Sequence, residues 1–498
     1  MDEATTMHLE AADFVKLERN EDHGRIVVAT KEIDVGCKII REKPVLVWQS
    51  DKWEEYLTKF TALSPAEQLG VLDMHCFPLD SQQLHQHKHE IFRCADNVGF
   101  NQSLALKLLS ISLANGHDYY GREDLVYEEV ASFIPQSSRS NKCALFLYAS
   151  KVSHSCHPNV TYTSKTKDGK MEYKAVRKIE PGDVISFPYT SNIWETPTHL
   201  RRKELQDARS FYCKCKRCMG PDLLRIIKCG GSCKGVSECT YDSLGVPLWS
   251  CQDCNATPPT NYYEKMEEEC NMVINQTERM MMTRGLSSIL VDDVKTNMIN
   301  IEKMLHPLHF LSLKATSQYA KLCASKAHDV EQNFHMVPPH SRGHFIRQFG
   351  KPEKLRSYAA KAAIKNVQAI ECIAAQCLGC NHSAGNMIHE AVYEASQTMF
   401  HCSQDLIECP PNLWPTNSKT MVRRYLPSMK IQFGESDPDV MNIQRKIIGA
   451  ADSQVDTSEV TQSFQSVNVS ADKAPSPKKK KNKKGGGGST KKKKKRGR

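Results

Sequence analysis

The sequence predicts an α+β fold in which a β core carries a helical insertion and is followed by a cysteine-rich segment and an α-helical C-terminal domain. Three observations lead to this prediction. Strand-like patterns lie on both sides of a helical stretch, cysteines crowd between Cys213 and Cys254, and successive helical patterns follow. At 498 residues the chain is long enough for two or three domains, because one core rarely grows beyond about 250 to 300 residues.

The β core is predicted from short alternating segments. Residues 24–48 alternate β-branched and polar residues around Gly36, which indicates short strands joined by turns. The pattern is helical from Asp51 to about Gly121, most clearly in "LALKLLSISLANG". Strand character returns in "KCALFLYASKV", "VTYTSKTKDGKMEYKAV" and "GDVISFPYT", where the Asp168-Gly169 pair is expected to form a hairpin turn.

The C-terminal half predicts helices. The segments "YYEKMEEECNMVINQTERMMM", "LHFLSLKATSQYAKLCASKA", "KLRSYAAKAAIKNVQAIECIAAQC" and "AGNMIHEAVYEASQTMF" have helical apolar spacing. They suggest stacked helical pairs of the tetratricopeptide (TPR) kind, although no clean fixed period is present. The expected parts are an N-terminal segment (1–19), the β core (20–219) with its helical insertion (about 51–140) and a cysteine loop (about 200–219), a cysteine-rich insert (220–258), a helical domain (259–450) and a tail (451–498).

The basic charge of the chain belongs to its tail. Residues 478–498 hold 13 of the 67 lysines and arginines and no acid, so that without them the formal charge of +10 becomes −3. Such a run repels itself and cannot bury a core, which predicts a disordered extension from about Ala451. It would act as a solvating tail, or in nuclear import, or in contact with nucleic acid or another acidic surface.

The rest of the composition predicts a soluble intracellular protein of the nucleus, the cytoplasm or both. No run approaches the roughly 18 apolar residues of a membrane span, and the N-terminus is acidic where a signal peptide would be basic and then apolar. The 20 cysteines therefore lie in a reducing compartment, where clustered thiols are more often metal ligands than disulfides. Zinc is the expected metal.

The first cysteine set is C-x-C-x2-C, formed by Cys213, Cys215 and Cys218. A closed structural zinc site needs four ligands, and Cys156 in "SHSCHPNV" is the candidate for the fourth. Such a site would tie two distant loops together and contribute on the order of 10 kcal/mol to folding. The alternative is three free buried thiols.

The second set pairs a C-x3-C with a C-x2-C. It consists of Cys229, Cys233, Cys251 and Cys254, and its spacing suits a small zinc ribbon. Two other groups are not expected to bind metal: "CLGCNH", where core cysteines are the better interpretation, and the histidines of "HQHKH" with Cys76 and Cys94, whose spacing fits no common zinc finger.

Four ordered motifs resemble those of SET-domain protein lysine methyltransferases, in the branch of the SET-and-MYND (SMYD) proteins. They are "GRIVVATKEIDVGCKIIREKP", "ALFLYASKVSHSCHPNV", "IEPGDVISFPYT" and the post-SET segment "RRKELQDARSFYCKCKRC". "MLHPLHFLSLKATSQYAKLC" also resembles the start of that branch's helical domain, so the likeness runs from about residue 20 to about residue 405. It implies a SET-type β core with a post-SET zinc loop, S-adenosyl-L-methionine as cofactor and a protein lysine as substrate.

The resemblance also assigns roles to residues. It places Ser153 and His154 at the cofactor, turns Cys156 toward the post-SET zinc, and directs the hydroxyl of Tyr189 at the departing methyl group. Phe211 matches the aromatic that packs against cofactor and lysine channel. Gly24, Arg25 and Ile26 correspond to the family's G-x-G, whose backbone approaches the cofactor.

The sequence departs from the family at several of these positions. Ile26 replaces the second glycine of G-x-G, Ser153 replaces an asparagine, and Arg209 replaces a tyrosine four residues before the first post-SET cysteine. An upstream asparagine is replaced near residues 131–132. The MYND finger is absent, because residues 51–100 contain only Cys76 and Cys94.

Two functions are therefore compatible with the sequence. The first is a protein-lysine methyltransferase acting on histone or non-histone lysines. The second is a SET scaffold with little or no transfer, which binds a protein partner through its helical domain and nucleic acid or other acidic surfaces through its tail. The substrate lysine and its methylation state are not readable from the sequence.

Overall fold

The structure is a computed structural model, and it describes residues 7–20, 24–119, 142–164, 166, 168–190, 192–231, 233–259, 261–283, 291–378 and a few positions between 426 and 444. The chain divides into two units, residues 1–453 and 454–498, and the second lies outside the described residues. So do the predicted helix at 384–400 and most of "CLGCNH". Across the described part of the chain, no helix is long and apolar enough to cross a membrane.

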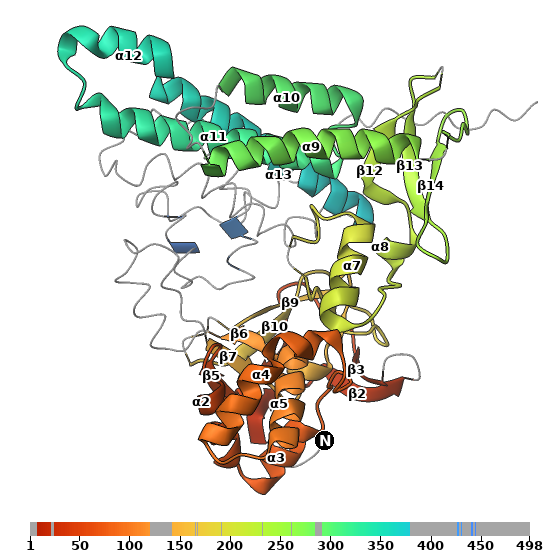
Figure 1. Cartoon of the computed structure of the whole chain (residues 1–498). Helices are drawn as coiled ribbons and strands as arrows, with labels where there is room; N and C mark the ends of the chain where they lie inside the picture. The colour runs from red at the N-terminus through yellow and green to blue at the C-terminus, as the bar shows by residue number, and fades with distance from the viewer. Residues whose placement is uncertain are drawn as a thin grey trace, which may run out of the picture. The chain divides into compact units, whose positions relative to one another are not determined.

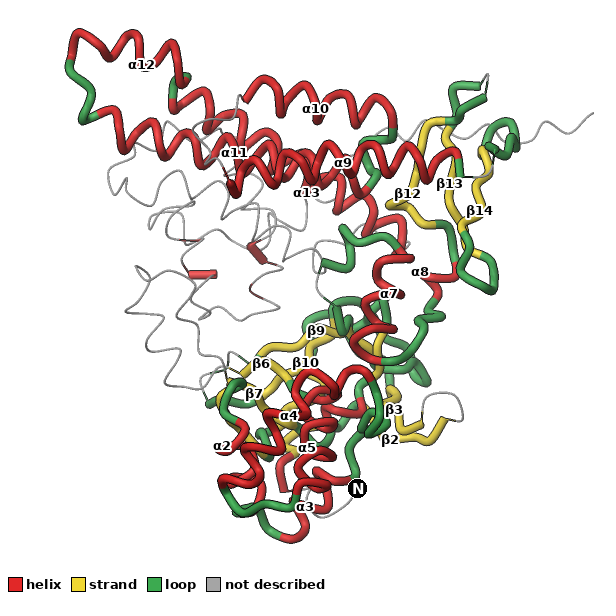
Figure 2. The backbone as a smooth tube through the Cα atoms, in the orientation of Figure 1, coloured by secondary structure: helices red, strands yellow, loops and turns green. Residues whose placement is uncertain are grey.

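Short strands build the β core (Figures 1 and 2). A four-stranded antiparallel sheet has the order β1-β4-β10-β9, a second sheet has the order β5-β7-β6, and β2 pairs with β3. The strands are β1 (Leu9–Ala11), β2 (Val15–Asn20), β3 (Gly24–Ala29), β4 (Lys38–Glu42), β5 (Leu46–Gln49), β6 (His117–Tyr119), β7 (Lys142–Leu145), β9 (Val160–Thr163) and β10 (Met171–Ala175). All five side chains of β10 are buried, so this strand lies at the centre of the core.

Glycines form the turns where the sequence predicted them. Gly36 has a φ of +85° between β3 and β4, and Gly169 has a φ of +68° between β9 and β10. A Cβ atom at Gly169 would also lie 2.5 Å from the hydroxyl oxygen of Tyr119. The predicted hairpin at Asp168-Gly169 is therefore confirmed. The positive φ favours glycine there, and a larger residue would also have to displace the Tyr119 hydroxyl.

The helical insertion consists of α2 (Trp53–Thr61), α3 (Pro65–Leu72), α4 (Gln82–Asn97) and α5 (Gln102–Asn115). Ser64 and Glu67 form a capping box at the start of α3, and the Asn101 side chain accepts a hydrogen bond from the backbone of Leu104 at the start of α5. The prediction that helical character continues to Gly121 is wrong. The chain leaves the helix at Gly116 because the next residues pair as β6 with β7.

The cysteine-rich segment follows α7 (Thr198–Arg209) and α8 (Lys216–Met219). It folds as a three-stranded antiparallel sheet of β12 (Asp222–Lys228), β13 (Val236–Tyr241) and β14 (Pro247–Cys251). Its second cysteine set lies at one end of this sheet, because Ser237 pairs with Cys251 and the N–H of Cys229 bonds to the carbonyl of Gly235.

The described C-terminal region is helical, with α9 (Tyr262–Thr283), α10 (Val291–Met304), α11 (Phe310–Phe334), α12 (Arg342–Phe349) and α13 (Pro352–Leu378). Figure 1 shows α9, α10 and α11 lying side by side, and buried alanines on α11 and α13 allow these two helices to pack closely. The helices α9, α11 and α13 confirm three predicted ones, whereas α10 and α12 were not predicted. A TPR-like arrangement stays a prediction.

Candidate active site and metal centres

The site is built on two very short parallel strands, β8 (Ser153–His154) and β11 (Ser186–Phe187), which pair Ser153 with Ser186 and Phe187 with His154. The buried residue Asn159 stabilises the backbone beside this strand pair. Its side-chain amide donates to the carbonyl of Val184 at 2.9 Å, and its side-chain oxygen accepts from the backbone of Ser186 at 2.8 Å. Both the donor and the acceptor of this buried amide are therefore satisfied by the segment that leads into β11.

His154 connects the loop with Tyr189. Its Nδ1 atom accepts a hydrogen bond from the backbone N–H of Tyr189 at 3.0 Å, and its Nε2 atom lies 3.3 Å from the sulfur of Cys156. Because Nδ1 is an acceptor, the ring proton of the neutral imidazole resides on Nε2 and points at the sulfur. Burial lowers the pKa of His154 to about 4, which keeps the ring neutral.

Three aromatic rings gather around this contact. The ring centroid of His154 lies 5.2 Å from that of Tyr189 and 5.6 Å from that of Phe211, and the last two are 6.3 Å apart. The hydroxyl of Tyr189 donates to the carbonyl of Val152 at 2.7 Å, and burial raises its pKa to about 12. The tyrosine is therefore a protonated phenol with a fixed ring, held among aromatic faces that attract cations.

The other predicted cofactor residues lie on β3 and β8. Ser153 is half-buried beside His154. Gly24 begins β3 with a φ of +71°, Arg25 pairs with Asp73 of the helical insertion, and Ile26 is buried. The structure thus brings Ser153, His154, Tyr189 and Phe211 together, whereas the side chain of Arg25 is engaged by the insertion.

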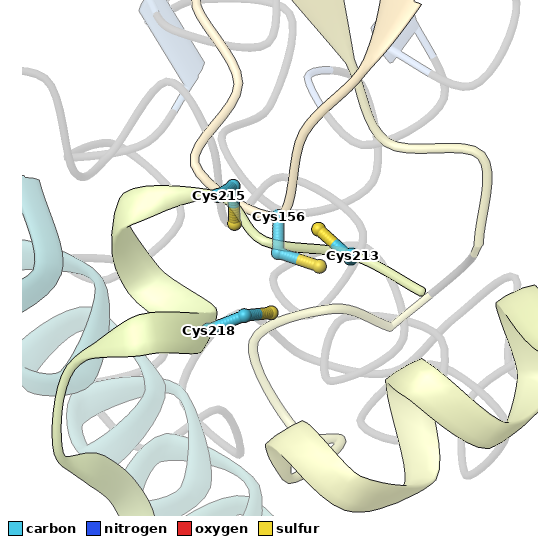
Figure 3. Close-up of side chains that lie close together, drawn as sticks. All are labelled: Cys156, Cys213, Cys215 and Cys218. Carbon is cyan, nitrogen blue, oxygen red and sulfur yellow. The ribbon is translucent and has the colours of Figure 1, made fainter. Parts of the chain in front are cut away.

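The first cysteine set converges from the loop that carries Cys156 and from the segment that leads into and forms α8 (Figure 3). The sulfurs of Cys156, Cys213, Cys215 and Cys218 all lie within 4.8 Å of one another. Four thiolates around a zinc ion at about 2.3 Å would be separated by about 3.8 Å, so the spacing suits a tetrahedral site. Hydrogen bonds from the three other thiols lower the pKa of Cys215, and their presence raises the pKa of Cys213. Without a cation the four thiols cannot all ionise.

Buried arginines surround this cluster. Arg201 is 0% exposed, and one of its nitrogens lies 3.5 Å from the sulfur of Cys218. Arg217 is also buried and donates to the carbonyl of Cys156 at 3.3 Å. Buried guanidinium groups require nearby negative charge, and four thiolates around a divalent cation carry a net charge of −2. The donor set and its surroundings therefore fit a zinc ion.

The second set, Cys229, Cys233, Cys251 and Cys254, also lies within 4.8 Å. Three sulfur–sulfur distances fall between 3.4 and 3.8 Å, far longer than a disulfide bond and close to the edge of a zinc-thiolate tetrahedron. Backbone N–H groups of Gly231 and Gly235 point at two of these sulfurs. These bonds would stabilise thiolates and fit a zinc ribbon.

Sequence reasoning missed the buried carboxyl group of Glu42. This residue is 0% exposed at the end of β4, and its two oxygens accept from the backbone N–H groups of Tyr148 and Ala149, each at 2.8 Å. It thereby fixes the start of η2 (Ala149–Lys151), the turn that leads into β8. An acid in "KIIREKP" is not distinguishable by sequence from the exposed charges beside it.

Comparisons with known proteins match the part of the chain that contains these residues. Residues 24–190 match the family model of the SET domain. The N-lysine methyltransferase SMYD2 of Gallus gallus is 37% identical over 76 residues, which is 15% of this chain and 16% of the relative. The SET domain-containing protein SmydA-8, isoform B, of Drosophila melanogaster is 26% identical over 317 residues, 51% of this chain and 69% of the relative. The matched segments cover 15 to 32% of the length of the first five curated relatives.

Two solved structures were also found to be similar. The SET domain of LSMT bound to lysine and AdoHcy is 11% identical to this chain, with coverage of 73% of this chain and 90% of that one. Rubisco LSMT bound to AdoMet has the same identity, with coverage of 74% and 93%. The TM-score is 0.27 in both cases, which is too low to establish a shared fold.

Proposed function

We propose that the protein, whose residues 24–190 match the family model of the SET domain, is an S-adenosyl-L-methionine-dependent protein-lysine N-methyltransferase acting on histone or non-histone lysines. One observation carries the proposal. The backbone N–H of Tyr189 donates a hydrogen bond to His154, and its hydroxyl donates to the carbonyl of Val152, so that its ring is fixed beside Phe211. This is a pre-organised aromatic site in which a tyrosine hydroxyl has one fixed direction.

The cofactor, when bound, supplies an electrophilic methyl group on a sulfonium. The aromatic rings of His154, Tyr189 and Phe211 offer faces that suit both a heteroaromatic base and a cation, so the residues present fit this group. The chain itself has three tasks: to orient donor and acceptor, to exclude water, and to favour the neutral form of the lysine amine. Apolar and aromatic surroundings lower the pKa of an amine, which serves the third task.

We also propose zinc ligands, from the sulfurs that lie close together. Cys156, Cys213, Cys215 and Cys218 would hold a structural zinc that fixes the loop carrying His154, and the second set would hold a zinc in the ribbon. Neither site takes part in methyl transfer, because four protein ligands leave no open position.

The test is calorimetric titration of S-adenosylmethionine into the zinc-loaded full chain, followed by transfer of a labelled methyl group to histones and to a lysine peptide array. We expect a Kd in the micromolar range, and in Tyr189→Phe a similar Kd with transfer lowered by about 100-fold. Tyr262→Phe, which changes an exposed tyrosine of α9, is the control. Absence of cofactor binding in the wild-type protein would refute the enzyme assignment.

The second candidate function is a SET scaffold with little transfer. A groove of about 830 Å³ between residues 192–200 and the helices α9 and α11 favours this scaffold function. Five glutamates line this groove against two lysines, Lys314 and Lys321, which gives it an acidic lining. A scaffold would bind a basic protein segment there without any cofactor, and binding that is unchanged by S-adenosylmethionine in a chain that shows no transfer would select this function.

A further inference from the structure

Arg209, the last residue of α7, directs its side chain into the candidate active site. One guanidinium nitrogen donates to the backbone carbonyls of Leu113 and Ala114, at 2.6 and 2.9 Å. The guanidinium carbon lies 5.7 Å from the centre of the Tyr189 ring. The two carbonyls belong to the last turn of α5, the negative end of a helix dipole, which is a favourable place for a cation.

The Tyr189 ring, which the guanidinium approaches, is one end of a continuous series of aromatic rings. The centroids of His117 and Tyr162 are 5.3 Å apart, those of Tyr162 and Phe187 are 5.3 Å apart, and those of Phe187 and Tyr189 are 5.0 Å apart. The charge of Arg209 acts on this series, because burial first and Arg209 second lower the pKa of His117 to about 4. Aromatic faces beside helix-end carbonyls make a cation site.

The backbone around Arg209 is held in place. The Gln83 side chain of α4 donates to the carbonyl of Asp207 at 2.9 Å and to the hydroxyl of Ser210 at 2.8 Å. Ser210 ends α7 with a φ of +58°. The helical insertion therefore clamps the end of α7, and movement of the Arg209 side chain, rather than of the helix, is the simplest way to vacate the cation site.

We propose that Arg209 occupies the cation site beside Tyr189 that a substrate lysine would have to enter, and that it is an internal competitor which the substrate has to displace. The inference rests on the proposed function, because that function is what requires a lysine at Tyr189. Two cations cannot share the cation site, since both seek the same aromatic faces and carbonyls and repel each other. A neutral side chain at position 209 would leave the cation site open to an amine.

Binding of n-butylammonium, which reproduces the side chain of lysine, tests the proposal without any methyl transfer. The zinc-loaded full chain, with 13C-labelled histidine, is titrated while the His117 signal is followed by NMR. We expect binding to Arg209→Ala and Arg209→Tyr at least about tenfold tighter than to wild type. Lys203→Ala is the matched control, because Lys203 lies on the exposed side of the same helix.

Equal affinity of butylammonium for the wild type and both variants would overturn the proposal. The proposal would also be overturned if neither variant bound butylammonium although at least one of them retained its zinc and the circular dichroism of the wild type. Two variants are used because one of them could fold poorly after losing the contacts to α5. This readout decides the role of Arg209 even if the protein never binds S-adenosylmethionine, so the two proposals can fail separately.

Transfer gives a second readout if the cofactor binds. We expect Arg209→Tyr to methylate lysine peptides at least about tenfold faster than wild type at low peptide concentration, because the competitor is gone. If butylammonium enters the variants but transfer is unchanged, Arg209 does not limit access and the inhibitory role is wrong.

Discussion

Single buried polar residues hold the candidate site in shape. Asn159 satisfies two backbone groups of the strand segment around β11, and Glu42 satisfies two at the start of the turn that leads into β8. These hydrogen bonds go to backbone groups and not to the aromatic rings of the site. Their effect on function is indirect: each fixes the backbone from which Tyr189 or His154 projects, and each would leave unsatisfied buried groups if it were replaced.

The Glu42 carboxyl makes stability depend on pH. Burial raises its pKa to about 7, against the two backbone hydrogen bonds, which lower it. Because the pKa of Glu42 is higher in the folded chain than in the unfolded one, the folded chain keeps this carboxyl protonated at pH values where the unfolded chain has lost the proton. The stabilisation that results is complete below about pH 4.5 and is lost as the pH rises through 7. We expect the free energy of unfolding of the wild type to fall, relative to Glu42→Gln, by up to about 3 kcal/mol between pH 5 and pH 8.

Urea denaturation at pH 5, 6, 7 and 8 measures this difference, and Glu180→Gln, at an exposed position after β10, is the control. Comparing variants at each pH removes the contributions of histidines that both proteins share. Parallel pH profiles for the wild type and Glu42→Gln would show that Glu42 does not titrate in this range.

At the scale of elements, loops rather than helices or strands assemble the site. The strands β8 and β11 have two residues each and would not be stable alone, but the loop with Cys156 brings them next to Cys213, Cys215 and Cys218. His154 makes the connection, since one of its nitrogens faces the Cys156 sulfur and the other orders Tyr189. A metal at these cysteines would therefore stabilise the aromatic rings of the candidate site as well as the fold.

This arrangement predicts two zinc ions per chain with different consequences of loss. Cys156→Ser should retain one zinc and lose cofactor binding, because the loop of His154 is released. Cys254→Ser should also retain one zinc but bind S-adenosylmethionine as the wild type does, because Cys254 lies in the ribbon. Metal analysis and calorimetry measure both. Wild-type protein without zinc, or Cys156→Ser with two ions, would refute the assignment of Cys156.

At the scale of the whole molecule, the largest buried apolar cluster among the described residues joins the region after β11 with the helices. It includes Ile193, Trp194 and Leu224 together with residues of α10, α11 and α13. Arg217 lies over the Trp194 ring, with its guanidinium carbon 4.4 Å from the ring centre, and so links this cluster with the first cysteine set. Helical region and metal loop therefore contribute to one folded unit.

The polybasic tail gives a prediction at the same scale. We propose that Lys478–Arg498 directs the protein to the nucleus, because its 13 lysines and arginines are the main source of net positive charge. A fluorescent fusion lacking these residues should shift to the cytoplasm, whereas a fusion with the tail alone should enter the nucleus. Continued nuclear residence of the truncated fusion would contradict the proposal.

The sequence by itself determined the features that depend on local interactions. Periodicity identified the strands around Gly36, the hairpin at Asp168-Gly169 and the helices α9, α11 and α13, because each is set by neighbouring residues. The cysteine spacings identified both sets of sulfurs that the structure brings together. Motif order identified Tyr189, His154 and Phe211 as one group, which the structure also assembles.

Only the tertiary structure decided features that depend on distant partners. Strand β6 ends the helical insertion because it meets β7, and α10 packs on α11 despite a mixed sequence pattern. The burial of Glu42 follows from its contact with a turn about one hundred residues later, which no local pattern encodes. The contacts of the Arg209 side chain with Tyr189 and the end of α5 also depend on residues far away in the sequence. The packing between elements, and not the neighbouring residues, determines what surrounds a charged side chain.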